Sequence, residues 1–310
     1  MARWDRGRTT TIPGWFWESV ETPVTEHSVE VHECEVAFRQ WDTGATCAGG
    51  VLMLHGLYAH SRWWDFIAPQ ISDGSRVVAM DLTGMGDSDH RYEYTSATYV
   101  DEILAVADAA NLDSSTILVG HSFGGRMATK TVAARPERFG GLVLVDSGVH
   151  DPKEPERNLA DSSPRAGRPK LYPSREIAES RFRLFPAQPN TNDYLLRYIA
   201  KHSVILVETD AYTWKFDSDL PIALKDVEAS PKDYECLQLP VSIIYGEKSE
   251  SYTRATNDYT ISLIPEPLRT ASIADARHHV FLDQPDRFVD ELNLSLKWIA
   301  GQKRQQGSSW

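Results

Sequence analysis

The chain has 310 residues, of which 41% are hydrophobic and 25% are charged, as is typical of a soluble globular enzyme with one large domain or a core plus an insertion. Its formal net charge of −12 argues against nucleic acid or an anionic membrane as the main partner, because both bind to positive surfaces. The three cysteines form neither a metal-binding spacing nor a disulfide framework. No apolar stretch has the length of a signal peptide or of a membrane span. We therefore expect a soluble cytoplasmic protein.

The first predicted element is an alternating stretch at residues 28–41, which we expect to form an antiparallel pair of strands. Five brief and nearly all apolar runs follow, a pattern typical of strands that are covered on both faces in a parallel sheet. They lie at residues 50–55, 76–82, 116–121, 141–146 and 241–246. Segments with helical periodicity lie between them, at residues 62–71, 97–110 and 123–139. This alternation predicts a doubly wound α/β sheet with right-handed crossovers.

The alternation stops after Asp146 and resumes at Val241. The residues in between are rich in proline, arginine and aromatic side chains, and we expect helical pieces at residues 174–185 and 192–207. An insertion here leaves the sheet beside the carboxyl ends of its strands, where ligands bind in open α/β sheets. We therefore expect a core and a cap over the ligand site. The core comprises residues 1–149 and 236–310, and the cap comprises residues 150–235.

The candidate nucleophile lies in the run Gly120-His121-Ser122-Phe123-Gly124. A Gly-x-Ser-x-Gly pattern alone occurs by chance in many chains, but here an apolar strand precedes it and a helix follows, which is the context that the motif requires. The two glycines keep side chains out of the strained turn, and the turn holds the serine hydroxyl exposed above the sheet. Ser122 is therefore the expected nucleophile.

With this motif in its context, the chain resembles the α/β-hydrolase superfamily, from about residue 28 to about residue 300 and least in the insertion. The resemblance implies a mostly parallel central sheet flanked by helices, with a mainly helical cap inserted after the sixth strand. It also implies a serine carboxylesterase-like enzyme that needs no metal and no cofactor.

The resemblance assigns an oxyanion hole to the segment that follows the strand at residues 50–55. His55-Gly56 ends that strand, and the backbone amides of Leu57 and Phe123 would bind the developing negative charge. The loop after the next strand is also similar to the family's loop, and we interpret four of its residues as structural. They are Asp81, Gly84, Gly86 and Ser88.

The candidate base lies near the C-terminus, in a segment that resembles the family's histidine loop. In relatives the histidine precedes a short apolar run, an acidic residue, one further residue and a proline. Counting back from Asp283 and Pro285 assigns the base to His278. The neighbouring His279 is the rival, and we expect it to be exposed to solvent. Arg277 replaces the usual glycine, and its charge could disfavour an imidazolium or bind an anionic substrate.

The acid is not where the family usually has it, because Ser249 occupies the position at which many relatives carry an aspartate. Glu247 follows the strand glycine directly and is expected to point away. Glu250 is displaced by one residue, but its longer side chain could reach the histidine. Asp146 ends the preceding strand, and the resemblance to one branch of the haloalkane dehalogenases implies an alternative acid there. We favour Asp146 over Glu250, while an aspartate at this strand end could also merely cap a loop.

The resemblance implies ester hydrolysis, with carbon–carbon bond, lactone or thioester hydrolysis as alternatives and a ligand receptor as the non-enzymatic alternative. We expect a small-molecule ester with an apolar or aromatic part as the partner, because aromatic side chains are expected around the pocket. They are Tyr58, Trp63, Trp64 and Trp214, with Tyr194, Tyr198 and Phe216 as further candidates, and Trp63 and Trp64 could equally be core residues. Arg126, Arg181 and Arg183 could contact a substrate carboxylate. A monomer or a homodimer is expected.

Overall fold

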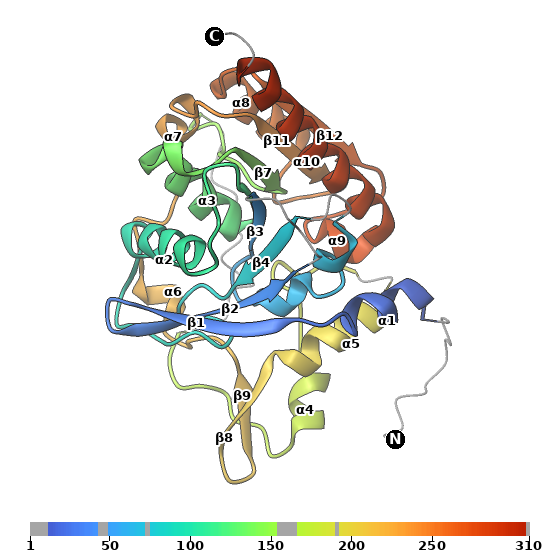
Figure 1. Ribbon diagram of the computed structural model, residues 1–310. Helices are drawn as coiled ribbons and strands as arrows, with labels where there is room; N and C mark the ends of the chain where they lie inside the picture. The colour runs from blue at the N-terminus through green and yellow to red at the C-terminus, as the bar shows by residue number, and fades with distance from the viewer. Residues whose placement is uncertain (1–11, 43–48, 72–74, 154–165, 190–191, 308–310) are drawn as a thin grey trace.

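The computed structural model describes residues 12–42, 49–71, 75–153, 166–189 and 192–307, and its helices cover both faces of a central sheet (Figure 1). In the described residues this sheet has the strand order β1-β2-β4-β3-β6-β7-β11-β12. The strands span Thr25–Val31 (β1), Cys34–Trp41 (β2), Arg76–Met80 (β4), Gly50–Leu54 (β3), Ile117–His121 (β6), Gly141–Val145 (β7), Val241–Gly246 (β11) and Leu268–Ile273 (β12). β2 is antiparallel to both β1 and β4, and all other pairs are parallel. The predicted antiparallel pair and the predicted parallel sheet are both confirmed.

The central strands are apolar throughout because each face of the sheet is covered by helices. In β3, for example, Leu52 packs into one hydrophobic core and Val51 packs into the other. The first core lies against α2 (Ser96–Ala109) and α3 (Phe123–Ala134), whereas the second lies against α10 (Pro285–Gly307) on the opposite side (Figure 1). Burying one such side chain stabilises the fold by about 1.5–3 kcal/mol, so the sheet is held from both sides.

The segment at residues 62–71 forms short 3₁₀ helices instead of the expected α-helix. They are η1 (Ser61–Trp64) and η2 (Ala68–Gln70). Pro69 lies at the start of η2, and a proline inside a helix lacks the amide hydrogen and clashes with the preceding turn. The other two expected helices are confirmed as α2 and α3, and α3 ends just before Pro136.

The chain leaves the sheet after β7 and returns at β11, as the sequence predicts. Its described elements in between are α4 (Arg175–Ser180), α5 (Asp193–His202), β8 (Val204–Glu208), β9 (Ala211–Trp214), α6 (Leu220–Ala223), β10 (Leu224–Lys225) and α7 (Pro231–Glu235). The helix expected up to residue 207 ends at His202, and the residues that follow form a β8–β9 hairpin, which projects below the sheet in Figure 1. The prediction was wrong there because β-branched residues such as Val204 favour a strand once a partner strand is present.

The remaining described elements lie near the ends of the chain and between the strands. They are α1 (Gly14–Val20), β5 (Tyr94–Thr95), which pairs with β10, η3 (Pro136–Arg138), α8 (Arg254–Leu263) and α9 (Val280–Asp283). Within the described residues, no helix combines the length and the apolar character needed to cross a membrane. Because β3, β6, β7 and β11 are parallel neighbours, their carboxyl ends meet at one edge of the sheet, and the candidate site lies there.

Candidate active site

Ser122 lies in a sharp turn between β6 and α3, with φ 52° and ψ −115°. A non-glycine residue with positive φ stores strain of about 1–3 kcal/mol. The glycines around it allow a close approach of strand and helix, because a Cβ on Gly120 would lie 2.5 Å from the Cα of Gly125. A Cβ on Gly124 would lie 2.4 Å from the backbone oxygen of His55. The turn therefore requires glycine on both sides, and it leaves the Ser122 side chain only half-buried.

His278 lies in the loop between β12 and α9, and the fold brings it to Ser122. Its Nε2 is 2.9 Å from Ser122 Oγ, a distance at which the hydroxyl can donate its proton to the ring. The backbone oxygen of His278 accepts a hydrogen bond of 3.0 Å from His121 Nε2. No local sequence pattern indicates this contact, which ties the histidine loop to the residue just before the serine.

Asp146 lies directly after β7 and is the carboxylate that contacts the histidine. His278 Nδ1 donates to Asp146 Oδ2 at 2.7 Å. The same oxygen accepts from Ser249 Oγ at 2.6 Å, and Oδ1 accepts from the amide of Gly246 at 3.0 Å. Asp146 is only 2% exposed, and this burial raises its pKa, while the hydrogen bond and the charge of His278 and the bond from Ser249 act in the opposite direction.

It is Asp146, and neither of the two glutamates considered from the sequence, that contacts His278 Nδ1. Glu247 and Glu250 are both exposed, and the Glu247 carboxylate accepts a hydrogen bond from the amide of Asp275 at 3.4 Å. Ser249, at the position where relatives carry the acid, instead donates to Asp146. The geometry therefore joins Asp146, and not Glu250, to the histidine.

Residues 55–57, the oxyanion segment, approach the turn that carries Ser122, and Phe123 follows Ser122 directly. A Cβ on Gly56 would lie 3.5 Å from Ser122 Cβ, which shows how closely this segment approaches the nucleophile turn. Among the described residues, neither the backbone amide of Leu57 nor that of Phe123 donates a hydrogen bond to another protein group. A hydrogen bond joins the segment to the loop after β4, because His55 Nε2 accepts from the amide of Leu82 at 3.1 Å. Two rigid and unused donors are suited to bind a developing oxyanion.

The loop after β4 supports that segment through buried polar contacts. Asp81 accepts hydrogen bonds from the amides of Ser61 and Asp87, and so joins the loop to the residues that follow the oxyanion segment. Gly86 has φ 67°, and a Cβ there would lie 2.2 Å from the carboxyl carbon of Asp81. These contacts agree with a structural role for the loop.

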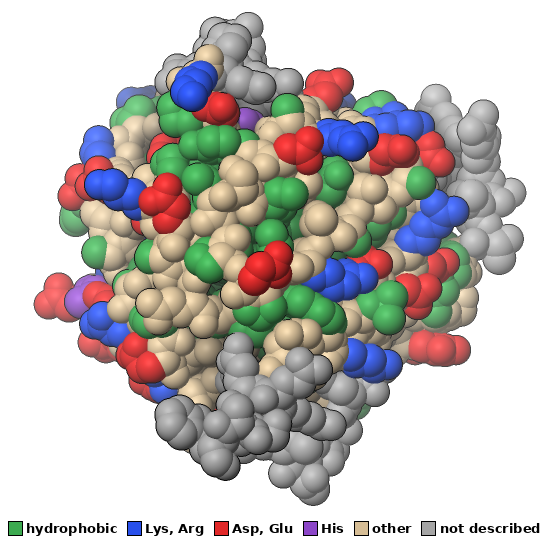
Figure 2. All heavy atoms as spheres, turned by 90° about the horizontal axis from the view of Figure 1, so that it is seen from above, with side chains coloured by type: hydrophobic (Ala, Val, Ile, Leu, Met, Phe, Trp, Pro, Cys, Tyr) green, Lys and Arg blue, Asp and Glu red, His purple; other side chains and the backbone are tan. Residues whose placement is uncertain are grey.

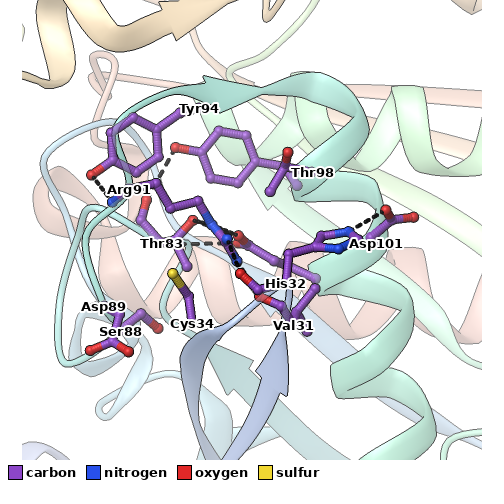
Figure 3. Close-up of polar contacts among 12 residues, drawn as sticks. Val31, His32, Cys34, Thr83, Ser88, Asp89, Arg91, Tyr94, Thr98 and Asp101 are labelled. Atoms are coloured by element: carbon purple, nitrogen blue, oxygen red, sulfur yellow. Dashed lines mark hydrogen bonds and ion pairs between the residues drawn. The ribbon is translucent and has the colours of Figure 1, made fainter.

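An internal ion pair anchors the far end of this loop (Figure 3). Arg91 Nε donates to Glu102 Oε1 at 3.1 Å, and the guanidinium also donates to the backbone oxygens of Val31 and His32 at 2.6 and 3.1 Å. Burial raises the pKa of Glu102, while hydrogen bonds from Thr83 and the charge of Arg91 act against that rise. The network fastens the loop to β1 and α2.

His279, expected at the surface, is only 2% exposed, so that expectation was wrong. Its ring packs 5.4 Å from the ring of Trp63 and 5.4 Å from that of His121, between the histidine loop and η1. Burial lowers the pKa of both His121 and His279 well below the usual value of 6.5, and the neighbouring His278 adds to this effect. Both rings are therefore neutral packing and positioning groups near neutral pH.

His121, His278 and His279 are also the residues whose arrangement could hold a metal ion. One nitrogen of each lies within 4.8 Å of the others. Both nitrogens of His278 already contact Ser122 and Asp146, however. A metal bound by His278 would have to replace its contact with Ser122 or with Asp146.

The Arg277 side chain forms an ion pair with Asp283, a carboxylate of its own loop. Its guanidinium lies 3.7 Å from Asp283 Oδ2, and its backbone amide donates to the same oxygen at 2.8 Å. The charge that was expected to act on His278 or on a substrate is therefore largely balanced within the loop.

A cavity of about 340 Å³ adjoins the oxyanion segment on the side of the inserted residues. Four of the aromatic residues expected around the pocket, Tyr58, Trp63, Trp214 and Phe216, contribute to its wall, and Leu57 lines it as well. Ser122 and His278 are not among the lining residues, but Leu57 is, and the adjacent Gly56 packs closely against Ser122. Such a space can hold the part of a substrate that lies beyond the reacting bond.

Other aromatic candidates lie elsewhere. Trp64 is 0% exposed and packs in the core with its ring 5.1 Å from that of Phe281, so its expected place in the pocket was wrong. Tyr198 donates to Asp65 at 2.6 Å, and Tyr194 packs against Phe16 with ring centroids 5.0 Å apart. Trp63 and Trp64 are adjacent in the sequence, and the sequence pattern does not indicate which of the two rings faces the cavity.

Comparison with known proteins identifies sequence relatives of this chain. A model described as "Alpha/beta hydrolase family" matches residues 51–291, which is more than half of the chain. Lipase LipV of Mycobacterium tuberculosis is 36% identical over 99 residues, covering 32% of this chain and 37% of LipV. The 2-hydroxymuconate semialdehyde hydrolase of a Pseudomonas strain is 34% identical over 108 residues, covering 33% of this chain and 38% of that enzyme. The alignments thus span less than two fifths of either relative.

The fold as a whole is similar to solved structures. A novel esterase of Mycobacterium tuberculosis, Rv0045c, aligns with a TM-score of 0.71, covering 94% of this chain and 100% of that one. The sequence identity of this pair is 20%, so the likeness concerns the fold alone.

Proposed function

Because the chain belongs to the alpha/beta hydrolase family, we propose that it is a serine hydrolase that cleaves a carboxylic ester through an acyl-enzyme intermediate. One observation carries the proposal. An unbroken hydrogen-bond chain runs from Ser122 to His278 at 2.9 Å and from His278 to Asp146 at 2.7 Å. A serine hydroxyl, an imidazole and a buried carboxylate in this order form the arrangement that activates a serine as a nucleophile.

In the proposed mechanism, Ser122 attacks the ester carbonyl while His278 Nε2 accepts the hydroxyl proton. Asp146 keeps the imidazole in the required tautomer and stabilises the imidazolium. The amides of Leu57 and Phe123 bind the negative charge on the former carbonyl oxygen. His278 then gives its proton to the departing alcohol, and in the second half it activates a water that releases the acid. The insertion expected at residues 150–235 acts as a cap, and its described residues supply part of the cavity wall and exclude water from the acyl group.

Carbon–carbon bond hydrolysis is the second candidate. It is favoured by the similarity of this chain to a 2-hydroxymuconate semialdehyde hydrolase, at 34% identity over 108 residues. A serine, a histidine and an oxyanion hole serve both reactions, and the fold does not choose between them. Assays with a vinylogous diketone beside an ester of similar size separate the two.

The proposal is tested by covalent labelling and by turnover. A fluorophosphonate should modify wild-type protein at Ser122 and leave Ser122→Ala unmodified, and the same variant should lose p-nitrophenyl butyrate hydrolysis. Ser262→Ala, which changes an exposed serine of α8, is the matched control and should behave as wild type. Absence of both labelling and turnover in the wild type would favour a ligand receptor on this fold instead.

A further inference from the structure

The cavity beside the candidate site is surrounded by cationic side chains. All of these cations belong to the inserted residues, and they are Arg168, Lys170, Arg181, Arg183 and Lys215. Among the described lining residues there is no aspartate or glutamate. The chain as a whole has a formal net charge of −12, so this concentration of positive charge runs against its composition. The face drawn in Figure 2, for comparison, carries acidic and basic side chains intermixed.

Most of these cations have no acidic partner within the described part of the chain. Lys215 is the exception, because it pairs with Asp87. Lys170 lies over the ring of Tyr172 at 5.6 Å, and Arg183 donates to the backbone oxygen of Ser180 at 3.1 Å. Arg168, Lys170, Arg181 and Arg183 take part in no ion pair among the described residues, which leaves their charges available to a ligand. Arg126, the third arginine expected to reach a substrate, instead pairs with Glu228 and does not line the cavity.

The other part of the wall is apolar. Tyr58 packs against Phe185 and Phe216 with ring centroids 5.3 and 5.0 Å apart, and Phe182 packs against Trp214 at 6.0 Å. Leu57 and these rings line the same cavity as the cations. A ligand there therefore meets both apolar surface and positive charge, and Leu57 and Tyr58 connect the cavity to the oxyanion segment.

We propose that the enzyme selects substrates carrying an anionic group, a carboxylate or a phosphate, on the portion that occupies this cavity. The proposal rests on the function proposed above and narrows its substrate class. Guanidinium groups bind both kinds of anion through paired hydrogen bonds, and several cations in one cleft concentrate an anionic substrate. Carboxylate and phosphate are the two possible sources of the charge, so the experiment has one arm for each.

The first arm compares p-nitrophenyl hydrogen suberate with its methyl ester, which has the same chain and no charge. The second arm compares butyryl-pantetheine with its 4′-phosphate. We expect the anionic member of at least one pair to have a kcat/KM about tenfold higher, and the pair that responds identifies the anion. The preference should fall as the ionic strength is raised from about 0.02 to about 0.5 M, because salt screens the attraction.

Arg168→Gln and Arg181→Gln test the residues. Each substitution should reduce the anionic-to-neutral ratio of kcat/KM about threefold, and the double variant should bring it close to one. Arg126→Gln is the matched control, because it removes an arginine that lies outside the cavity and should leave the ratio unchanged. An unchanged ratio in the double variant, or ratios near one for both pairs in the wild type, would overturn the inference.

A binding measurement keeps the inference testable if no ester is cleaved. Calorimetry with Ser122→Ala should give tighter binding of suberate than of dimethyl suberate, or of phosphopantetheine than of pantetheine. Equal binding within both pairs contradicts the anion site. Tighter anion binding without any turnover in the wild type supports the site and counts against the proposed hydrolase activity, so the two failures are distinguishable.

Discussion

Replacing Asp146 by asparagine is the sharpest test of the proposed mechanism. The carboxylate contacts His278 Nδ1 at 2.7 Å, and both side chains are almost completely buried. Asparagine keeps the shape, but it removes the charge and can present an amide hydrogen to the ring. It would then stabilise the tautomer in which Nδ1 is unprotonated and Nε2 cannot accept the proton of Ser122.

The expected loss can be estimated from the geometry. Opposite charges about 4 Å apart at an effective dielectric constant of about 20 attract by about 4 kcal/mol, and the imidazolium that forms in the transition state loses this stabilisation. That energy corresponds to a factor of about 10³ in rate, and the unfavourable tautomer increases it further. In a Ser-His-Asp enzyme the equivalent change lowers kcat by about 10⁴, so we expect a loss of about 10³–10⁴ here.

The assay is p-nitrophenyl butyrate turnover, with circular dichroism and thermal melting to confirm that each variant is folded. Glu250→Gln is the control, because that glutamate is exposed and should alter kcat/KM less than about twofold. A folded Asp146→Asn enzyme within about tenfold of wild type would refute the reasoning. So would a large loss in Glu250→Gln.

A second variant tests whether the acid can be moved. Ser249 Oγ and His278 Nδ1 both bond to the same oxygen of Asp146, so a carboxylate at position 249 would lie near the ring. We expect Asp146→Asn with Ser249→Asp to recover about tenfold or more of the activity lost in the single variant. No recovery in a folded double variant would show that the loop position cannot orient the base in this chain.

Three further changes have defined outcomes. Glu102→Ala leaves Arg91 buried without its partner and should lower the free energy of unfolding by about 3–5 kcal/mol in urea titrations, whereas Asp108→Ala, at an exposed ion pair, should cost less than about 1 kcal/mol. His279 is buried and neutral, and on unfolding it regains a pKa near 6.5 and binds a proton in acid, so its contribution to stability is present above that pH and is lost below it. The free energy of unfolding of the wild type should therefore decrease between about pH 7.5 and about pH 5.5, and in His279→Gln this decrease should be smaller by about 1.4 kcal/mol. An equal decrease in the variant and the wild type would contradict a neutral His279. Gly124→Ala would put a methyl group 2.4 Å from a backbone oxygen, so we expect activity and melting temperature both to fall, and a variant of wild-type activity would exclude the tight turn.

The parallel strands were predictable from the sequence because a strand buried on both faces must be apolar at every position. The runs at residues 50–55 and 141–146 lie within one residue of β3 and β7. Short apolar runs are ambiguous when they lie outside the sheet, however. The residues after His202 were expected to continue a helix, and pairing with β9 makes them a strand.

By itself the sequence determined the sheet, the place of the insertion and the turn that carries Ser122, since each depends on residues close together in the chain. Only the tertiary structure decided that Asp146 rather than Glu250 meets His278, because those partners are 132 positions apart. It also decided that His279 is buried and that the cations of the insertion gather around one cavity. Such contacts arise from the packing of distant segments, and no local pattern of apolar and polar residues records which side chains will face each other.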